Sequence, residues 1–562
     1  AGAAAGAAAG AAAGAAAGAA AGARRASAAV SVAPLSWADG WQAASPTILA
    51  RDFDLIVVGS DCASEAGVPL ALLGLVLLKD APATRMLLTV EVRLEDAAHT
   101  ARLEQLRELV EAKCDVETVE LGRVRGGGAL VESWRCVATP APDAASGATA
   151  DEGAGAARRP STVAVHTYHS LVISTRSGEL HSCGAHVDEE YDGGGYGLHM
   201  LGHGAASGAA VLVPRPVAGL WGVRVREVAA GVAHSLLRTE RGAVFSWGDG
   251  ALGKLGHSSA SLASGGVLTE PLPVAALLGV RATGIACGND FSLVLGEAGE
   301  LHSFGDNRAG QLGRPSATPG APSDGAPALV QGLEGLRVRV VSGGATHALG
   351  IAEEGGAVAS PEEDGALYSW GGGGGGCLGH GDEAAQLLPR RLEALRGVHV
   401  RHCACGDEFS LAVDAVGGLW SWGCGDEGRL GLGDELGRCA PTRVAALEGT
   451  PVRAASAGGD HALVLTEAGE VHAFGCGEDG QLGLGDDKSN QLLPRRVLFD
   501  RGPEEVHDPV VEAHAGFFFS AALTADGALH TWGHGEGGKL GHGDEEEQAT
   551  PCLVGAMEGC LV

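Results

Sequence analysis

The chain has 562 residues, of which 92 are glycine and only 4% are aromatic, so turns are abundant and bulky core residues are few. Its 39 basic and 69 acidic residues leave a formal charge of −30, which argues against general binding to nucleic-acid phosphates. No apolar run reaches the ~18 residues of a membrane span. The 13 scattered cysteines form no compact framework, which favours an intracellular protein, cytoplasmic or nuclear.

Residues 1–23 repeat alanine, with a glycine at every fourth position from Gly2 to Gly22. Alanine favours helix, but each glycine costs about 1 kcal/mol relative to alanine, so we interpret this stretch as low-complexity sequence. Because the chain begins with Ala1 rather than Met, we expect its natural start to lie upstream.

Residues 33–137 have the pattern of an α/β domain. The periodicity predicts a strand at 55–58, a helix at 69–78, a strand at 88–92, a helix at 103–110 and a strand at 115–124. Strands and helices that alternate at this spacing predict half of an open, doubly wound sheet, which is a partial Rossmann-like domain.

The stretches "APLSWADG", "FDLIVVGSD", "LLTVEVR" and "LEQLRELVEAKCDVETVEL" resemble the C-terminal half of a class I, seven-strand protein-lysine methyltransferase. This resemblance implies S-adenosylmethionine as cofactor, with Trp37 against its adenine, Ser60 lining it and Asp61 beside the target nitrogen. The family's aromatic residue after that Asp is replaced by Ser64. Its glycine-rich cofactor loop would precede Leu35, where no strand–turn–helix pattern occurs. The alternative is that Trp37, Ser60 and Asp61 only pack or turn the chain.

A linker at residues 138–161, rich in small residues, Pro and Asp, precedes a repeated phrase such as "VFSWG" or "LHTWG". Each copy is followed by a glycine turn that ends in Leu-Gly. The fourth residue of the phrase falls at Cys183, Trp247, Phe304, Trp370, Trp422, Phe474 and Trp532. Seven copies at intervals of 52 to 66 residues predict seven four-stranded units that close into a β-propeller, because radial repetition leaves few open sheet edges. The aromatic residue is expected to fill the wedge between blades.

The repeated phrase resembles the regulator of chromosome condensation repeat, and residues 162–562 are identified as a propeller of that family. The expected fold class is therefore mainly β, a seven-bladed β-propeller after a smaller α/β segment. The last unit stops before a final strand, and "STVAVHTYHSLV" at 161–172 matches the missing piece. This match predicts that Val163–Val165 completes the sheet of Thr531 and Trp532.

The histidines of the repeats are expected to pack rather than to catalyse. One repeat position holds either His or Phe, at His169, His234, Phe291, His347, Phe409, His461 and Phe519. The "HCAC" stretch at 402–405 lacks a second pair of ligands at zinc spacing, so we predict no metal site. The hexaglycine at 371–376 lacks the following helix that a phosphate loop needs.

Acidic residues follow the Leu-Gly turns of four units. They are Asp382 and Glu383, Asp434 and Glu435, Asp486 and Asp487, and Asp544 and Glu545. Because equivalent turns project from equivalent places on a propeller, we predict that these carboxylates share one rim that binds a basic protein surface. The alternative is ordinary solvated turn charge.

Three functions fit this sequence, and the fold does not choose among them. The first is a protein–protein interaction scaffold. The second is an S-adenosylmethionine-dependent protein-lysine methyltransferase, lacking its cofactor loop here, whose substrate the propeller selects. The third is guanine-nucleotide exchange on a small GTPase, which the repeat resemblance allows. Direct nucleic-acid binding is not expected.

Overall fold

The computed structural model describes eight segments of the propeller and four strands before it. The propeller segments are 161–184, 199–204, 210–220, 223–257, 266–315, 325–354, 365–499 and 509–557. The strands are 55–61, 85–93, 115–118 and 129–137. Trp37, the alanine repeat and the two helices expected at 69–78 and 103–110 lie outside the described residues.

The four N-terminal strands form one sheet, made of β1 (Leu55–Asp61), β2 (Arg85–Arg93), β3 (Asp115–Thr118) and β4 (Ala129–Val137). Their order is β1-β2-β4-β3, with β1 parallel to β2 and β4 antiparallel to both of its neighbours. The sequence predicted strands at the places of β1, β2 and β3 but not β4. Because β4 pairs along the whole of β2, it separates β3 from β2 and makes the sheet mixed rather than all parallel.

The propeller consists of seven four-stranded sheets, here called blades 1 to 7 in chain order. Blade 1 contains β5 (Val163–Val165), β6 (His169–Ile173), β7 (Leu180–Gly184) and β8 (Val211–Pro216). Blade 2 contains β9 (Val225–Ala230), β10 (His234–Thr239), β11 (Val244–Asp249) and β12 (Val267–Pro273). Blade 3 contains β13 (Ala282–Cys287), β14 (Phe291–Gly296), β15 (Leu301–Gly305) and β16 (Ala328–Leu329).

Blade 4 contains β17 (Leu336–Gly343), β18 (His347–Glu354), β19 (Ala366–Gly371) and β20 (Gln386–Arg391). Blade 5 contains β21 (Val400–Cys405), β22 (Phe409–Asp414), β23 (Leu419–Gly423) and β24 (Arg438–Arg443). Blade 6 contains β25 (Val452–Ala457), β26 (His461–Thr466), β27 (Val471–Gly475) and β28 (Gln491–Arg496). Blade 7 contains β29 (Val510–Ala515), β30 (Phe519–Thr524), β31 (Leu529–Gly533) and β32 (Gln548–Leu553).

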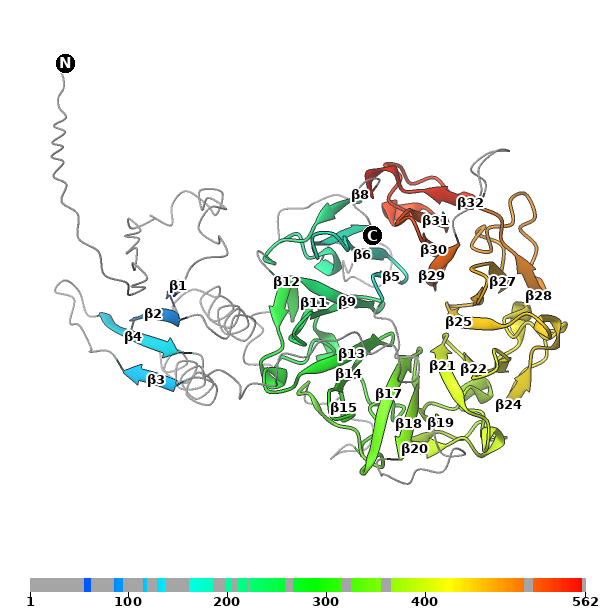
Figure 1. Cartoon of the computed structure of the whole chain (residues 1–562), viewed down its shortest axis with the longest axis horizontal. Coiled ribbons are helices and arrows are strands. Elements are labelled where there is room, and N and C mark those ends of the chain that lie inside the picture. The colour runs from blue at the N-terminus through cyan, green and yellow to red at the C-terminus, as the bar shows by residue number, and fades with distance from the viewer. Residues whose placement is uncertain are drawn as a thin grey trace, which may run out of the picture. The chain divides into compact units, whose positions relative to one another are not determined.

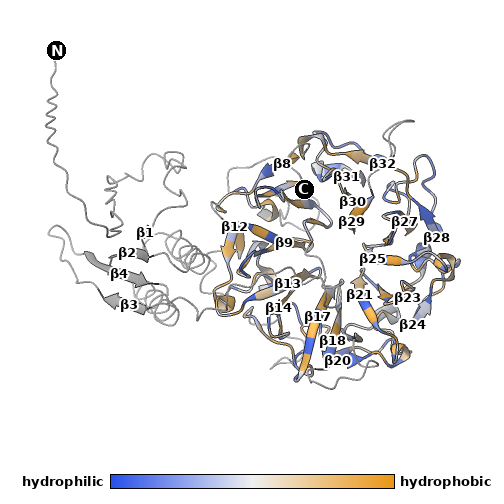
Figure 2. Cartoon of the chain, viewed as in Figure 1, coloured by the Kyte–Doolittle hydropathy of each residue, from blue (hydrophilic) through white to orange (hydrophobic). Residues whose placement is uncertain are grey.

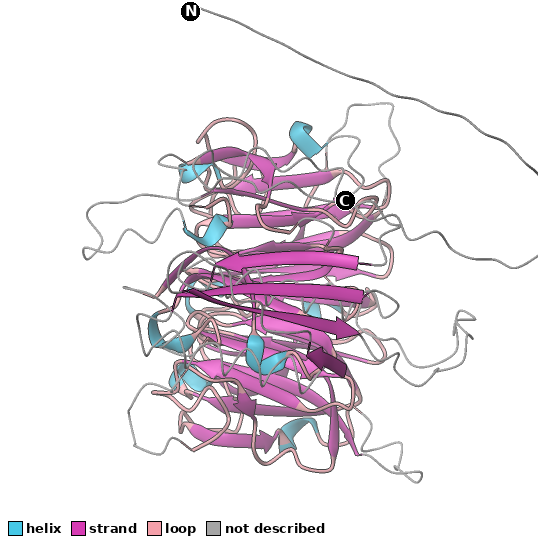
Figure 3. Ribbon diagram, turned by 90° about the vertical axis from the view of Figure 1, so that its left-hand side faces the viewer, coloured by secondary structure: helices cyan, strands magenta, loops and turns pink. Residues whose placement is uncertain are grey.

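Short 3₁₀ turns connect the strands, and Figure 3 shows them in cyan. They are η4 (His199–Leu201), η5 (Ala251–Gly253), η6 (Ala275–Leu277), η7 (Gly374–Gly376), η8 (Glu393–Leu395), η9 (Asp426–Gly428), η10 (Ala445–Leu447), η11 (Glu536–Gly538) and η12 (Gly555–Met557). The hexaglycine contains η7, which occupies the same place in blade 4 as η9 does in blade 5. It is therefore a blade turn.

In every blade the strands follow chain order from the centre outwards, and Figure 1 shows the seven first strands around a common centre. The second strands are buried along their length, as in β10 and β22, whereas outer strands such as β20 and β28 are largely exposed. Figure 2 accordingly shows β28 as mainly hydrophilic. Six of the seven outer strands contain a proline, which withholds a backbone donor and blunts an edge that would otherwise pair with other chains.

The aromatic residue of the repeated phrase fills the seam between two blades, as predicted. Trp247, Trp370, Trp422 and Trp532 are fully buried. Each indole N–H donates to a backbone carbonyl of the preceding blade, those of Met200, Gln311, Cys377 and Gln481, at 2.7 to 3.0 Å. These bonds satisfy the buried indole while its rings supply apolar contact.

The shared His/Phe position is also part of the seams. Each buried His bonds through Nε2 to a Ser of the next blade, at 2.8 to 3.0 Å, in the pairs His169–Ser235, His234–Ser292, His347–Ser410 and His461–Ser520. In each pair the Ser hydroxyl donates to a backbone carbonyl, so His must donate through Nε2–H. Its Nδ1 is buried without a hydrogen-bond partner among the described residues, which favours the neutral imidazole. Burial lowers the pKa of His169 and His461 to about 3, which agrees with this assignment.

Where Phe replaces His, Ala replaces Ser in the next blade. Phe291 of blade 3 precedes Ala348 of blade 4, and Phe409 of blade 5 precedes Ala462 of blade 6 at the equivalent positions. The pairing is therefore of a hydrogen-bonded type or an apolar type, and neither leaves a buried donor without an acceptor. The exception lies where the ring closes: there Phe519 of blade 7 is paired with a Ser, Ser170 of blade 1, instead of an Ala.

The prediction that Val163–Val165 completes the last blade is wrong. This segment is β5, which pairs with β6 in blade 1, whereas Thr531 and Trp532 belong to the sheet of blade 7. Each blade starts with its inner strand, whereas the repeated phrase used to count the units is the third strand. A unit counted from one phrase to the next therefore contains strands of two blades. We call the contact of blade 7 with blade 1 the closing seam.

No strand is shared across the closing seam, which is held by side chains and by a backbone bond from the Gly543 N–H to the Leu212 carbonyl at 2.9 Å. Thr162 donates to Glu512 through its backbone N–H and its hydroxyl, at 3.1 and 3.0 Å. Val163 and Val165 pack in one cluster with Phe519. Among the described residues no helix is long and apolar enough to cross a membrane.

Candidate interaction surface

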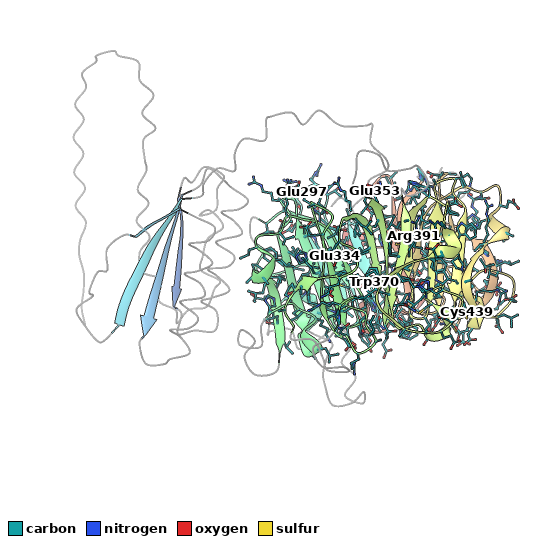
Figure 4. All side chains as sticks on the ribbon, turned by 90° about the horizontal axis from the view of Figure 1, so that it is seen from below. Glu297, Glu334, Glu353, Trp370, Arg391 and Cys439 are labelled. Atoms are coloured by element: carbon teal, nitrogen blue, oxygen red, sulfur yellow. The ribbon has the colours of Figure 1, made fainter. Side chains whose placement is uncertain are left out.

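The blades present two chemically different faces. Because neighbouring strands are antiparallel, the loop from first to second strand and the turn from third to fourth lie at the same end of a blade. We call this end the acidic face and the other end the opposite face. In Figure 4, Cys439 at the start of β24 lies toward the former, and Glu297, from a turn between second and third strands, toward the latter.

One Asp in each predicted acidic turn closes that turn. Oδ1 of Asp382, Asp434, Asp487 and Asp544 accepts a hydrogen bond from the backbone N–H two residues later, at 3.0 to 3.2 Å. Such Asx turns favour Asp whether or not a partner binds. The solvated-turn alternative therefore explains why these four residues are Asp.

Two of these turn residues also have basic neighbours. Asp434 pairs with Arg438 at 2.8 Å, and Asp487 pairs with Arg495 at 2.5 Å. Lys488 of blade 6 bonds Glu547 of blade 7 at 2.5 Å, so two of the acidic turns lie next to each other. These contacts reduce the charge that the turns offer to a partner.

The remaining predicted residues keep their charge exposed. Glu383, Glu435, Asp486 and Glu545 are exposed, and no ion pair to another described residue forms at any of them. They come from four successive blades, 4 to 7. The four carboxylates are thus available on one face.

Further carboxylates lie near the centre of the same face. Asp407 and Asp460 stand in loops between first and second strands, and Asp460 pairs with Arg429 at 2.6 Å. Burial and the charge of Asp460 raise the pKa of Asp407 to about 6. Asp407 and Asp460 stand just before the His/Phe position of their repeats, where the sequence predicts only packing, so they were not predicted as site residues.

A central cavity of about 430 Å³ is lined by the inner strands. His166, Asn289, Asp407 and Phe517 line its end at the acidic face. The Asn289 side-chain amide donates to Asp407 at 3.5 Å, which links blades 3 and 5. Burial lowers the pKa of His166 to about 4, so this histidine is neutral at physiological pH.

The "HCAC" stretch is part of β21. His402 bonds through Nε2 to the Ala455 carbonyl of the next blade at 2.8 Å. Within the segments that the structure describes, no three His, Cys, Asp or Glu side chains are grouped so that they could hold a metal ion.

The described backbone contains two of the three residues that the methyltransferase resemblance implies. Ser60 and Asp61 are the last two residues of β1, opposite Val90 and Glu91 of β2. Trp37 lies outside the described residues, so its place beside them stays a prediction.

Comparison with known proteins identifies the propeller. A family model described as RCC1-like domain matches residues 120–464, and the regulator of chromosome condensation (RCC1) repeat matches residues 468–523 and 526–560. The chain belongs to the RCC1-like family. The ultraviolet-B receptor UVR8 of Arabidopsis thaliana is 32% identical over 359 residues, which cover 64% of this chain and 76% of that protein.

Other relatives share only part of their length or only the fold. Human HERC2, an E3 ubiquitin-protein ligase, is 31% identical over 368 residues, which cover 65% of this chain but 7% of that protein. The crystal structure of human WBSCR16 has 27% identity and a TM-score of 0.52, covering 61% of this chain and 84% of that one. Prp20p of Saccharomyces cerevisiae has 23% identity and a TM-score of 0.54 over 64% of this chain and 83% of its own, which shows the fold alone.

Proposed function

We propose that this chain is a protein-interaction propeller whose acidic face binds a basic protein surface. The observation that supports it most is the set of exposed carboxylates Glu383, Glu435, Asp486 and Glu545, which lack internal partners among the described residues. Because these charges lie on one face, their fields add toward an approaching cation.

A small GTPase is the partner class to test first, with guanine-nucleotide exchange as the activity. The family resemblance allows this activity, and Prp20p was solved in a study of its binding to Gsp1p and histones. Those two partner types guide the choice of probes: histones as a basic protein surface, and a panel of small GTPases loaded with labelled GDP.

The experiment removes charge from one face without changing side-chain shape. The acidic-face variant combines Glu383→Gln, Glu435→Gln, Asp486→Asn and Glu545→Gln, and it leaves the four Asx-turn residues intact. The control combines Glu240→Gln, Glu297→Gln, Glu393→Gln and Glu448→Gln, four exposed carboxylates of the opposite face. Both variants lose the same net charge.

We expect histone binding by the acidic-face variant to weaken by about tenfold and to depend less on salt, because fewer charge contacts are screened. The control should bind like the unmodified chain. Equal binding by all three proteins, or equal loss in both variants, would contradict the proposal. Faster release of labelled GDP from one GTPase would add exchange activity.

Methyl transfer is a second candidate, supported by one observation. Ser60 and Asp61 lie at the carboxyl end of β1, which pairs in parallel with β2, and ligands of open α/β sheets bind at that end of the strands. The matched family models describe the propeller only. Titration of S-adenosylmethionine into the chain by calorimetry tests this candidate, and absence of heat, also from a version extended upstream, would discard it.

A further inference from the structure

Two lysines of the propeller occupy one repeat position. The sequence contains five lysines, at positions 79, 113, 254, 488 and 539. Lys254 and Lys539 each precede a Leu-Gly turn, in "GKLGHS" and "GKLGHG", and each is only 3% exposed. They therefore provide a matched pair within one fold.

Lys254 is surrounded by opposite charge. Its ammonium bonds Asp249 of its own blade at 2.5 Å and Asp290 of the next blade at 2.8 Å. Burial lowers the pKa of Lys254, but the two carboxylates outweigh it and leave the pKa raised. The Asp290 side chain is 39% exposed, so a surface carboxylate can reach a buried lysine at this position.

Lys539 lacks both carboxylates. His534 stands at the repeat position of Asp249, and Tyr168 stands at that of Asp290. The ammonium of Lys539 donates to His534 Nδ1 at 2.8 Å, and no carboxylate of a described residue lies within 4 Å of it. A buried ammonium with no carboxylate in contact is costly, and this cost favours an external anion at the closing seam.

We propose that the closing seam is a binding site for a carboxylate of a partner protein, with Lys539 as its counter-charge in the role that Asp290 fills for Lys254. The carboxylate would approach from the acidic face. The half-buried Phe518 lies beside His534, with ring centroids 6.1 Å apart, and its ring centroid is 4.4 Å from that of the half-buried Phe517. These rings suit a carboxylate next to an apolar group, such as a chain terminus that ends in an aromatic residue.

The surrounding charge limits the ligand to one negative charge. Glu536 lies 3.6 Å from His534. Three carboxylates raise the pKa of His534, namely those of Asp479 in blade 6, Glu536 and Glu547. Asp479 and Glu536 also raise the pKa of Lys539. These carboxylates repel a phosphate dianion about twice as strongly as a monoanion, and a single carboxylate would give Lys539 the counter-charge that Asp290 gives Lys254.

Binding should be coupled to the protonation of Lys539. Burial lowers the pKa of Lys539 to about 8, opposed in part by Glu536 and Asp479. Burial and the Lys539 charge likewise keep the His534 pKa below its ordinary value, so the imidazole is neutral. Because a bound carboxylate favours the ammonium, affinity should fall as the pH rises above 8.

Nuclear magnetic resonance of the full chain carrying ¹³Cε,¹⁵Nζ-lysine tests the site. The probe is N-acetyl-phenylalanine, with N-acetyl-phenylalaninamide as a control of the same shape without the charge. We expect the acid, but not the amide, to raise the titration midpoint of Lys539 by about one unit or more, a tenfold change in proton affinity. The Lys254 signal should not move, and acetate and inorganic phosphate should act more weakly than the acid.

Two variants keep the proposal falsifiable. His534→Asp supplies an internal carboxylate as in the Lys254 site, so its Lys539 signal should no longer respond to the acid while the fold is retained. Lys488→Met, at an exposed lysine, should leave the response intact. An unmoved Lys539 midpoint, equal effects of acid and amide, or an unchanged response in His534→Asp would overturn the site. None of these outcomes depends on the four acidic-face carboxylates, so this site and the acidic-face proposal can fail separately.

Discussion

The seam between blades 2 and 3 and the closing seam use the same repeat positions but fill them differently. In the former, Lys254 has two carboxylates, Phe304 fills the wedge and His234 bonds Ser292. At the closing seam the corresponding residues are Lys539, Cys183 and Phe519. The closing seam therefore lacks the ion pairs, the aromatic wedge and the His–Ser bond of the other.

The inner loops of neighbouring blades also lie farther apart at the closing seam than between blades 2 and 3. Around the centre, six loops carry glycine at one position, Gly231, Gly288, Gly344, Gly406, Gly458 and Gly516. A Cβ on Gly231 would lie 2.7 Å from the Gly288 carbonyl oxygen, whereas one on Gly516 would lie 3.1 Å from that of His166, the only non-glycine member. The blades thus approach each other less tightly at the closing seam.

The difference predicts that the closing seam is a weaker junction of the ring than the seam between blades 2 and 3. Its contacts include the two hydrogen bonds from Thr162 to Glu512, a bond from the Ser170 hydroxyl to the Lys539 carbonyl and the apolar cluster of Val163, Val165 and Phe519. Lys539 stands at a repeat position that lacks the ion pairs of its equivalent, Lys254. A residue there can serve binding with little loss of stability.

The largest effect is expected for the aromatic wedge. Trp422→Ala should reduce the free energy of unfolding by about 3–5 kcal/mol, because it removes a fully buried indole and leaves a cavity. Cys183→Ala, at the equivalent place in the closing seam, should cost only about 1 kcal/mol. Urea denaturation followed by tryptophan fluorescence and circular dichroism measures both, and similar losses would break the comparison.

The lysine pair comes next. Lys254→Met should cost about 3 kcal/mol, because it leaves the 10%-exposed Asp249 without its partner. Lys539→Met should change stability by less than about 1 kcal/mol in either direction, because it removes a buried charge that has no carboxylate partner. Chemical denaturation at pH 7 is the measurement, and a larger loss for Lys539→Met would contradict this account.

A smaller effect is expected for the His/Phe position. Phe409→His faces Ala462, so its buried Nε2–H would lack an acceptor, at a cost of about 1–3 kcal/mol. Phe519→His faces Ser170, whose hydroxyl already donates to the Lys539 carbonyl at 2.7 Å and can accept. We therefore expect the latter to be about 1 kcal/mol less damaging, as compared by thermal unfolding. If Phe519→His were the more destabilising variant, the Ser170 hydroxyl would not be accepting a hydrogen bond from the new histidine.

The smallest effect concerns pH. The folded pKa of Lys539 lies at about 8, below the unfolded value of 10.5, so above pH 8 the unfolded chain binds more protons and stability rises with pH. The rise from this residue between pH 7.5 and 8.5 should be about 0.5–1 kcal/mol. Comparison of the unmodified chain with Lys539→Met over this range isolates it. A difference between the two proteins that does not change with pH would refute the assigned pKa.

Much of the propeller could be predicted from its repeats. Trp247 and its equivalents stand at regular intervals, and a large side chain before a Gly-rich turn has few alternatives to the blade core. A periodic pattern does not define where its unit starts, however. The prediction that Val163–Val165 belongs to the last blade was therefore wrong. The strand β4 was missed because "ALVESWRCV" has no turn signal that separates it from the linker.

The candidate site was less predictable because its decisive contacts cross between blades. The acidic turns were visible, but not that Asp434 and its equivalents close the turn while Glu435 and its equivalents stay exposed. The His–Ser and Phe–Ala pairs are visible in "GVAHSLL" and "GATHALG" only when each unit is compared with the next. Likewise Lys539 differs from Lys254 through Tyr168, which lies at the far end of the propeller sequence.

Native-state hydrogen exchange in increasing denaturant tests the weakness of the closing seam most directly. The second strands β6 of blade 1 and β30 of blade 7 are buried like β14 of blade 3 and β22 of blade 5, so burial alone predicts equal protection. We predict that amides of β6 and β30 exchange through a partial opening of lower free energy than those of β14 and β22. Equal opening free energies in all four strands would contradict the account.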